Sequence, residues 1–224
     1  SDGKVYTVAN QTGTTFDLSG IDGSGWAAYT SGGKMYDCTG SAPLAVVYGA
    51  GAVTNGIVAD GGAHLRIDDV ALIGCGSKAT TASIGALLST NRSWIETNNV
   101  HQSDCTAANF VRDYSSGFFG GGKIYNCGTA NWAIHARFTF SSSSAATPTL
   151  TTTPIYKNCA IGVDIWEGAT GHADGAIFLD CDVSIFLRRS NSYCVAGANR
   201  YTNTGSSKIG IVVNDGGTLN RDPT

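Results

Sequence analysis

The sequence predicts an all-β protein built as a parallel β-helix, in which successive coils of strands stack on one another. The first observation is a recurring cysteine that follows a short apolar stretch and a residue typical of turns. The second is its spacing: 22 residues separate Cys105 from Cys127, and 22 again separate Cys159 from Cys181. A repeat of about twenty residues is typical of a solenoid whose coils bury one face on the next. The recurring cysteines are Cys75, Cys105, Cys127, Cys159 and Cys181.

The composition favours the same fold class. Thirty glycines among 224 residues and a charged fraction of only 14% are typical of a turn-rich β protein. No stretch shows the apolar period of an amphipathic helix. A net charge of −3 without any basic run predicts no binding to nucleic acid. The longest apolar stretch, 42–53, is short and contains two glycines, so we expect no membrane insertion.

The cysteines are expected to be buried free thiols. Seven is an odd number, and the sequence has no CxxC or HxxxH spacing, so neither a disulfide framework nor a zinc site is predicted. We expect no cofactor. Thiols that pack as small apolar groups suit assembly in a reducing cytoplasm.

The chain is expected to begin with a small β module. Residues 4–9 alternate as a strand does, residues 15–18 predict a second strand, and turn residues follow each of them. The next segment is rich in Gly and Ala and predicts an irregular first coil or a linker. The expected boundaries are 1–37 for the module, 38–64 for the irregular coil or linker, 65–215 for the β-helix and 216–224 for a polar tail.

Aligning the chain on four cysteines places the side chains of successive coils in columns. The sixth residue after each cysteine is apolar and should point inward, while its neighbours should point outward, because side chains alternate along a strand. The expected inward column is Val111, Ala133, Ile165 and Leu187; the outward columns are Phe110, Trp132, Asp164 and Phe186, and Arg112, Ile134, Trp166 and Arg188; the residues just past the strand are Asp113, His135, Glu167 and Arg189.

The residue before each recurring cysteine is a turn residue. It is Gly74, Asp104, Asn126, Asn158 or Asp180, and these types tolerate left-handed backbone and hydrogen-bond within their own turn. In this respect the chain resembles the right-handed parallel β-helix, whose turns commonly carry an Asx corner.

The N-terminal sequence resembles a known module. Residues 3–33 read GKVYTVANQTGTTFDLSGIDGSGWAAYTSGG. This is similar to the C-terminal half of the short β-barrel-like repeat labelled the FCCH domain of ubiquitin-activating enzymes. The same label occurs on phage and prophage tail proteins with a similar ending. The resemblance implies no ubiquitin chemistry, and it implies that the native polypeptide begins upstream of Ser1.

Joined to a β-helix, this resemblance implies a bacteriophage or prophage tail fibre or tailspike. What it implies for partners is a rigid homotrimer that contacts other virion proteins and host-surface polysaccharide. The expected location is the virion, after assembly in the host cytoplasm.

The column just past the strand is the first candidate site. Coils stack ~4.8 Å apart, which would place Asp113 and Glu167 about 9–10 Å from each other. Inverting glycosidases hold their two carboxylates ~6.5–9.5 Å apart. His135 between them could shift the pKa of either, so these three residues are the candidate catalytic set. The alternative is a ladder of opposite charges on a solvated face, which stabilises a sheet.

The outward aromatic residues are the second candidate site. Large apolar groups on an outer face mark a contact. That contact could be the face of a sugar ring or a second protein chain, as in a trimer. A third cluster, Asp164, Glu167, His172 and Asp174, could bind a cation or form an ordinary polar turn. The candidate ligand-binding or partner-binding residues are Phe110, Trp132, Asp164, Trp166, Phe186 and Arg189.

Three functions follow from these observations. The leading hypothesis is a receptor-binding virion fibre without enzymatic activity. The rival is a polysaccharide depolymerase, either hydrolase or lyase, on the same fold. The third is a purely structural virion decoration. The fold by itself cannot separate them, because function belongs to sites placed on a fold.

Overall fold

The computed structural model describes residues 8–10, 17–22, 45–49, 51, 54–79, 84–141, 153–204 and 208–220. The chain divides into two compact units, Ser1–Asp37 and Cys38–Thr224. In the first unit β1 (Val8–Ala9) pairs antiparallel with β2 (Asp17–Leu18). The rest of the expected small module, and Cys38, lie outside the described residues. No helix capable of crossing a membrane occurs in the parts of the chain that the structure describes.

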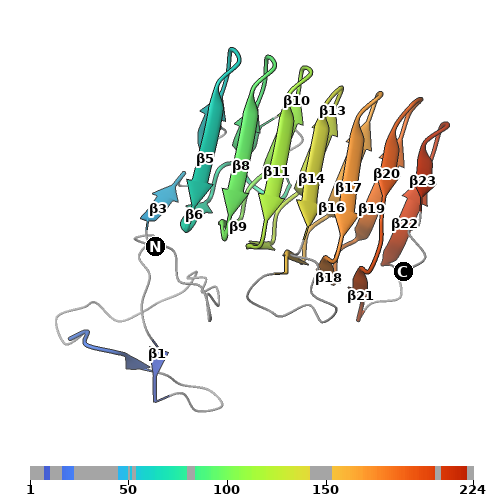
Figure 1. Ribbon diagram of the computed structural model, residues 1–224. Coiled ribbons are helices and arrows are strands. Elements are labelled where there is room, and N and C mark those ends of the chain that lie inside the picture. Colours follow the sequence, from blue (N-terminus) through green and yellow to red (C-terminus); the bar gives the residue numbers. More distant parts are fainter. Residues whose placement is uncertain are drawn as a thin grey trace. The chain divides into compact units, whose positions relative to one another are not determined.

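As far as its residues are described, the second unit is a parallel β-helix of seven coils, each contributing one strand to each of three parallel sheets (Figure 1). Sheet I consists of β3 (Ala45–Tyr48), β6 (Val70–Ile73), β9 (His101–Ser103), β12 (Lys123–Tyr125), β15 (Ile155–Lys157), β18 (Ile177–Leu179) and β21 (Arg200–Thr202). Sheet II consists of β4 (Ile57–Ala59), β7 (Gly85–Ser89), β10 (Ala107–Arg112), β13 (Thr129–Ile134), β16 (Ile161–Trp166), β19 (Val183–Arg188) and β22 (Ile209–Val213). Sheet III consists of β5 (His64–Asp68), β8 (Trp94–Asn98), β11 (Ser116–Gly120), β14 (Arg137–Ser141), β17 (Thr170–Asp174), β20 (Tyr193–Val195) and β23 (Thr218–Asn220).

Coiling already occurs in the segment expected to be an irregular first coil or a linker, and it ends later than the expected boundary. Strands β3, β4 and β5 form the first coil within and just beyond the segment expected to be an irregular coil or linker. Their apolar side chains Val47, Ile57 and Leu65 pack against the core, which is why this segment joins the solenoid. At the other end β23 lies within the expected polar tail and pairs with β20.

The inward column is confirmed by the register of sheet II. Val111 is paired with Ala133, Ala133 with Ile165, and Ile165 with Leu187. Each is at most 1% exposed and belongs to the continuous core of the solenoid. Fully burying a valine, leucine or isoleucine side chain stabilises a fold by about 1.5–3 kcal/mol.

The recurring cysteines also form one column inside the coils. The residue after each cysteine donates its backbone N–H to the carbonyl of the cysteine one coil before: Gly128 to Cys105, and Ala160 to Cys127, both at 3.0 Å. All five are free thiols that are no more than 1% exposed. Burial raises the pKa of the Cys127 thiol well above its ordinary value, so it remains a neutral, apolar packing group.

The turn residues before these cysteines adopt the predicted left-handed backbone. Their φ angles lie between 53° and 71°. Asn and Asp accept this conformation at low cost, and glycine has no side chain to strain. The five residues are Gly74, Asp104, Asn126, Asn158 and Asp180.

One part of the core is polar, which the sequence columns did not predict. Asn109 and Asn131 occupy the inward position that Leu87 and Val163 hold in neighbouring coils. The Asn109 amide donates to Asn131 at 2.8 Å, and Gln102 donates to Asn109 at 3.0 Å. Both asparagines are at most 3% exposed, so these hydrogen bonds offset part of the cost of burying their amides, although Nδ2 of Asn131 has no hydrogen-bond partner among the described residues.

Candidate functional site

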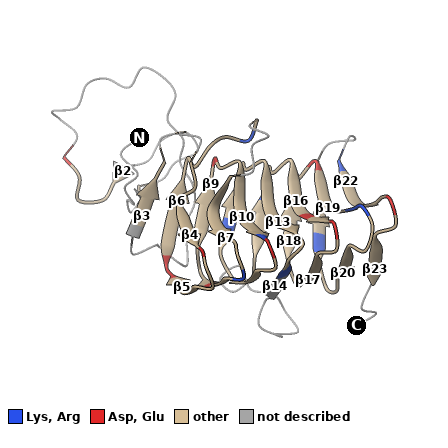
Figure 2. Cartoon of the chain, turned by 90° about the horizontal axis from the view of Figure 1, so that it is seen from above, with Lys and Arg blue, Asp and Glu red and all other residues tan. Residues whose placement is uncertain are grey.

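The bends between sheet II and sheet III carry the polar column predicted just past the strands. We call this column the II–III corner. Figure 2 shows that many of the charged residues of the second unit lie at bends between strands. In the third to sixth coils the II–III corner consists of 113–115, 135–136, 167–169 and 189–192.

Long side chains at this corner occupy an unfavourable backbone conformation. The φ angle is 62° at Tyr114, 48° at His135, 45° at Glu167 and 69° at Arg189. A left-handed conformation costs a residue with a side chain roughly 1–2 kcal/mol, whereas glycine adopts it freely. The bend before each cysteine meets the same requirement with Asn, Asp and Gly. Because the fold does not need costly residue types here, their presence points to a function at this corner.

The same corner is hollowed. A shallow, open depression of about 420 Å³ lies across the fourth to sixth coils. Arg189 donates from Nη1 to Oε1 of Glu167, and the other carboxylate oxygen lies 3.8 Å from Nε2 of His135. Three predicted site residues therefore meet in one place. The lining residues are His135, Glu167, Gly168, Arg189, Ser190 and Asn191.

Tyr114 stands beside this hollow and was not among the predicted site residues. Its side chain is 77% exposed, and its ring stacks at 6.4 Å and 22° on the ring of His135. An open aromatic face next to polar groups is suited to the apolar face of a sugar ring. A sequence signal existed: Tyr114 directly follows Asp113, whereas the equivalent residues in the next coils have small side chains.

Asp113 does not line the hollow. Its Oδ2 accepts a hydrogen bond from the hydroxyl of Thr90 at 2.7 Å and lies 3.2 Å from Nε of Arg112. These contacts involve its own coil and the preceding coil, whereas Glu167 contacts His135 and Arg189. The hollow thus contains one carboxylate rather than the pair that an inverting hydrolase needs. The catalytic roles of Asp113, His135 and Glu167 stay predictions.

The outward aromatic column has the predicted register but is not an open platform. Phe110 is paired with Trp132, Trp132 with Asp164, and Asp164 with Phe186. Phe110 is only 1% exposed, because the ring of Trp132 stacks on it at 4.5 Å. Phe110 is therefore covered by its own chain and is not available to a ligand, in contrast to the expectation.

Asp164 is likewise buried within the chain. It is 1% exposed and accepts hydrogen bonds from Arg188, at 2.8 Å to Nε, and from Nε1 of Trp166 at 2.7 Å. The Arg188 guanidinium lies 4.3 Å from the ring centres of both Trp166 and Phe186. Burial raises the pKa of the Asp164 carboxyl, and the hydrogen bond and charge of Arg188 partly offset this rise. These contacts hold the fifth and sixth coils together.

The residues of the third cluster, for which cation binding was the alternative to an ordinary polar turn, pair with other side chains or lie in different sheets. Asp164 is paired with Arg188, and Glu167 faces Arg189 and His135. His172 belongs to β17 in sheet III. Among the residues with described positions, no group of three or more His, Cys, Asp or Glu could hold a metal ion.

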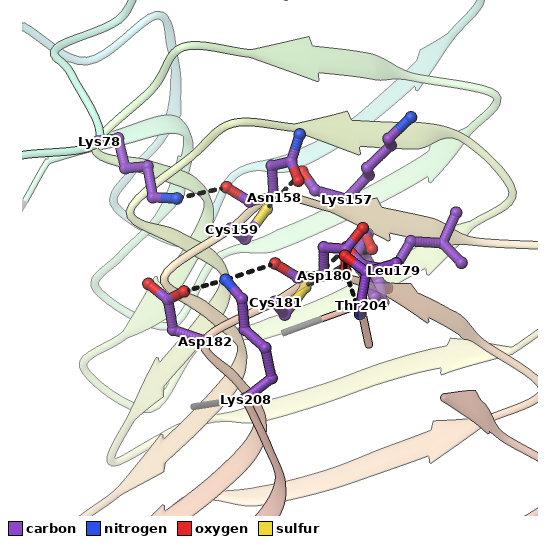
Figure 3. Close-up of polar contacts among 11 residues, drawn as sticks. Lys78, Lys157, Asn158, Cys159, Leu179, Asp180, Cys181, Asp182, Thr204 and Lys208 are labelled. Carbon is purple, nitrogen blue, oxygen red and sulfur yellow. Dashed lines mark hydrogen bonds and ion pairs between the residues drawn. The ribbon is translucent and has the colours of Figure 1, made fainter. Parts of the chain in front are cut away.

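A second polar cluster lies at the bend between sheets I and II, where lysines satisfy turn carbonyls (Figure 3). Nζ of Lys78 donates to the carbonyl of Asn158 at 2.7 Å, and Nζ of Lys208 donates to that of Asp180 at 3.1 Å. The hydroxyl of Thr204 lowers the pKa of the Asp180 carboxyl by hydrogen bonding to it. Each of these groups has a partner within the chain, so the cluster stabilises the bend.

Comparisons with known proteins identify no relative. No protein-family model matches the chain, no curated protein matches it, and no solved structure matches it. The function is therefore inferred from the II–III corner and its hollow.

Proposed function

We propose that this chain is a segment of a bacteriophage tail fibre or tailspike that binds host-surface saccharide through the hollow of the II–III corner. The observation that carries the saccharide proposal is the set of long side chains held in left-handed backbone around the hollow. Strands of sheets II and III flank each of the short bends that carry these side chains, so the stacked coils fix the spacing of the bends. The virion assignment is supported by the resemblance of the N-terminal residues to phage-tail modules.

Substitutions that suit the backbone test the proposed binding without unfolding the protein. Tyr114→Asn and His135→Asn remove the ring and the imidazole but place at each position a residue that favours positive φ. We expect both to weaken binding to isolated host capsule or lipopolysaccharide by more than about tenfold, or ~1.4 kcal/mol. The melting temperature should stay the same or rise. Calorimetric titration and thermal unfolding measure the two effects.

The matched control is Arg92→Asn. Arg92 has the same left-handed backbone, with a φ of 64°, at the corresponding bend of the second coil, whereas the hollow begins two coils later at His135. This variant should bind as the original protein does. The proposal would be refuted if Tyr114→Asn and His135→Asn bound as tightly as Arg92→Asn. It would also be refuted if the original protein bound no host glycan. Release of new reducing ends from the polysaccharide would instead favour the depolymerase.

The proposal includes a homotrimer that buries the outer face of sheet II. Several outward side chains on this face are apolar and only half-buried, among them Trp132, Ile134 and Val183. Light scattering should give about three times the 23.1 kDa of one chain. Ile134→Lys should yield monomers, because it places a charge in the apolar contact, whereas Thr170→Lys in sheet III should not. A monomeric original protein would contradict this part of the proposal.

A further inference from the structure

The charges of the hollow cancel one another. Its lining contains one carboxylate, Glu167, and one guanidinium, Arg189, which pair directly; the third ionisable group, His135, lies 3.8 Å from the same carboxylate. The other three lining residues carry no charge. The Glu167–Arg189 pair therefore adds no net charge to the lining, which offers hydrogen bonds instead.

Two arginines on the outer face of sheet II are also neutralised within the chain. Nε of Arg112 lies 3.2 Å from the carboxylate of Asp113, and Arg188 is bound by Asp164. An incoming carboxylate or phosphate would therefore have to compete with these internal partners. It would also meet repulsion from Glu167, because a like charge placed against a fixed charge is costly.

The arrangement of donors and acceptors matches hydroxyl groups instead. A hydroxyl both donates and accepts, so two hydroxyls on adjacent carbons can bond to a carboxylate oxygen and an N–H that lie side by side. Glu167 and Arg189 present such a pair, the Asn191 amide adds a donor and an acceptor, and the exposed Tyr114 ring adds an apolar face. Building on the proposed saccharide binding, we propose that the hollow takes a neutral sugar with vicinal hydroxyls rather than an acidic one.

The experiment compares acidic bacterial polysaccharides with their carboxyl-reduced forms, in which each uronate has become a neutral hexose. On an array of such pairs, together with natively neutral capsular polysaccharides, the protein should bind neutral forms at least about tenfold more tightly. Binding should change little between low and high salt. Glu167→Gln keeps the size of the side chain but leaves Arg189 without a countercharge, so this variant should gain affinity for the acidic forms.

The outcomes separate this inference from the proposed function. Preference for the acidic forms, or equal binding of both, would overturn the neutral-sugar inference while leaving saccharide binding intact. Binding to neither form would overturn both. An unchanged preference in Glu167→Gln would show that the Glu167–Arg189 pair does not set the charge selectivity, which also contradicts the inference.

Discussion

Replacing Arg188 with methionine is expected to lower the free energy of unfolding by about 3–5 kcal/mol at pH 7. The substitution leaves the Asp164 carboxylate, whose side chain is 2% exposed, without its cationic partner. It also removes the guanidinium that lies between the rings of Trp166 and Phe186. Denaturant unfolding of the two proteins measures the difference.

This loss of stability should depend on pH. An unfolded aspartate has a pKa of ~3.9, and without Arg188 the burial of Asp164 holds its folded-state pKa above that value. Below about pH 4 both states are protonated and the electrostatic part of the loss disappears. As the pH rises toward the folded-state pKa, the unfolded state gives up its proton first, so the loss grows. Unfolding measured at pH 4 and pH 7 should show this increase.

Two controls isolate the buried ion pair. Arg189→Met removes the neighbouring arginine, whose side chain is 58% exposed, and should cost less than about 1 kcal/mol. The double variant Asp164→Leu/Arg188→Met should recover much of the stability, because no buried charge is left unpaired. If the Arg188 and Arg189 variants lose equal stability, the pair does not hold the fifth and sixth coils together.

Ile165→Ala is expected to destabilise the protein by about 2–5 kcal/mol through loss of buried surface and the cavity left behind. Ile165 is 0% exposed and stacks between Ala133 and Leu187 in the core. The small side chain of Ala133 limits how far that neighbour can fill the space. Denaturant unfolding at a single pH measures the effect.

Ile161→Ala provides the matched comparison. Ile161 belongs to the same strand, β16, but is half-buried and lies outside the core cluster. The same atoms are removed, so the expected cost of less than about 1 kcal/mol reflects position alone. Similar losses for the two variants would contradict the inward column.

Because the coils repeat, much of this fold could be predicted from the sequence. Counting from Cys105, Cys127, Cys159 and Cys181 was sufficient to align the columns, because in-register coils place equivalent positions directly above one another. The turn residues before the cysteines were predictable because few residue types tolerate a positive φ. The edges of the solenoid were less predictable, because terminal coils have one neighbour and a weaker apolar pattern.

The candidate site was only partly predictable. The sequence placed His135, Glu167 and Arg189 in one column, and the structure brings them together around the hollow. Tyr114 was missed, and Asp113 was grouped with the others although it bonds to Thr90 in the preceding coil. Sequence position gives the column of a side chain but not the direction in which a flexible polar group turns at a bend.

The sequence by itself determined the all-β solenoid, its inward columns and its left-handed turns, because each depends on residue spacing and local backbone preference. Only the tertiary structure decided which outward residues are open to a partner. Phe110 lies under Trp132, and Asp164 is bound by Arg188, while Tyr114 stays exposed. The physical reason is that burial on an outer face depends on the size and direction of side chains in the adjacent coils.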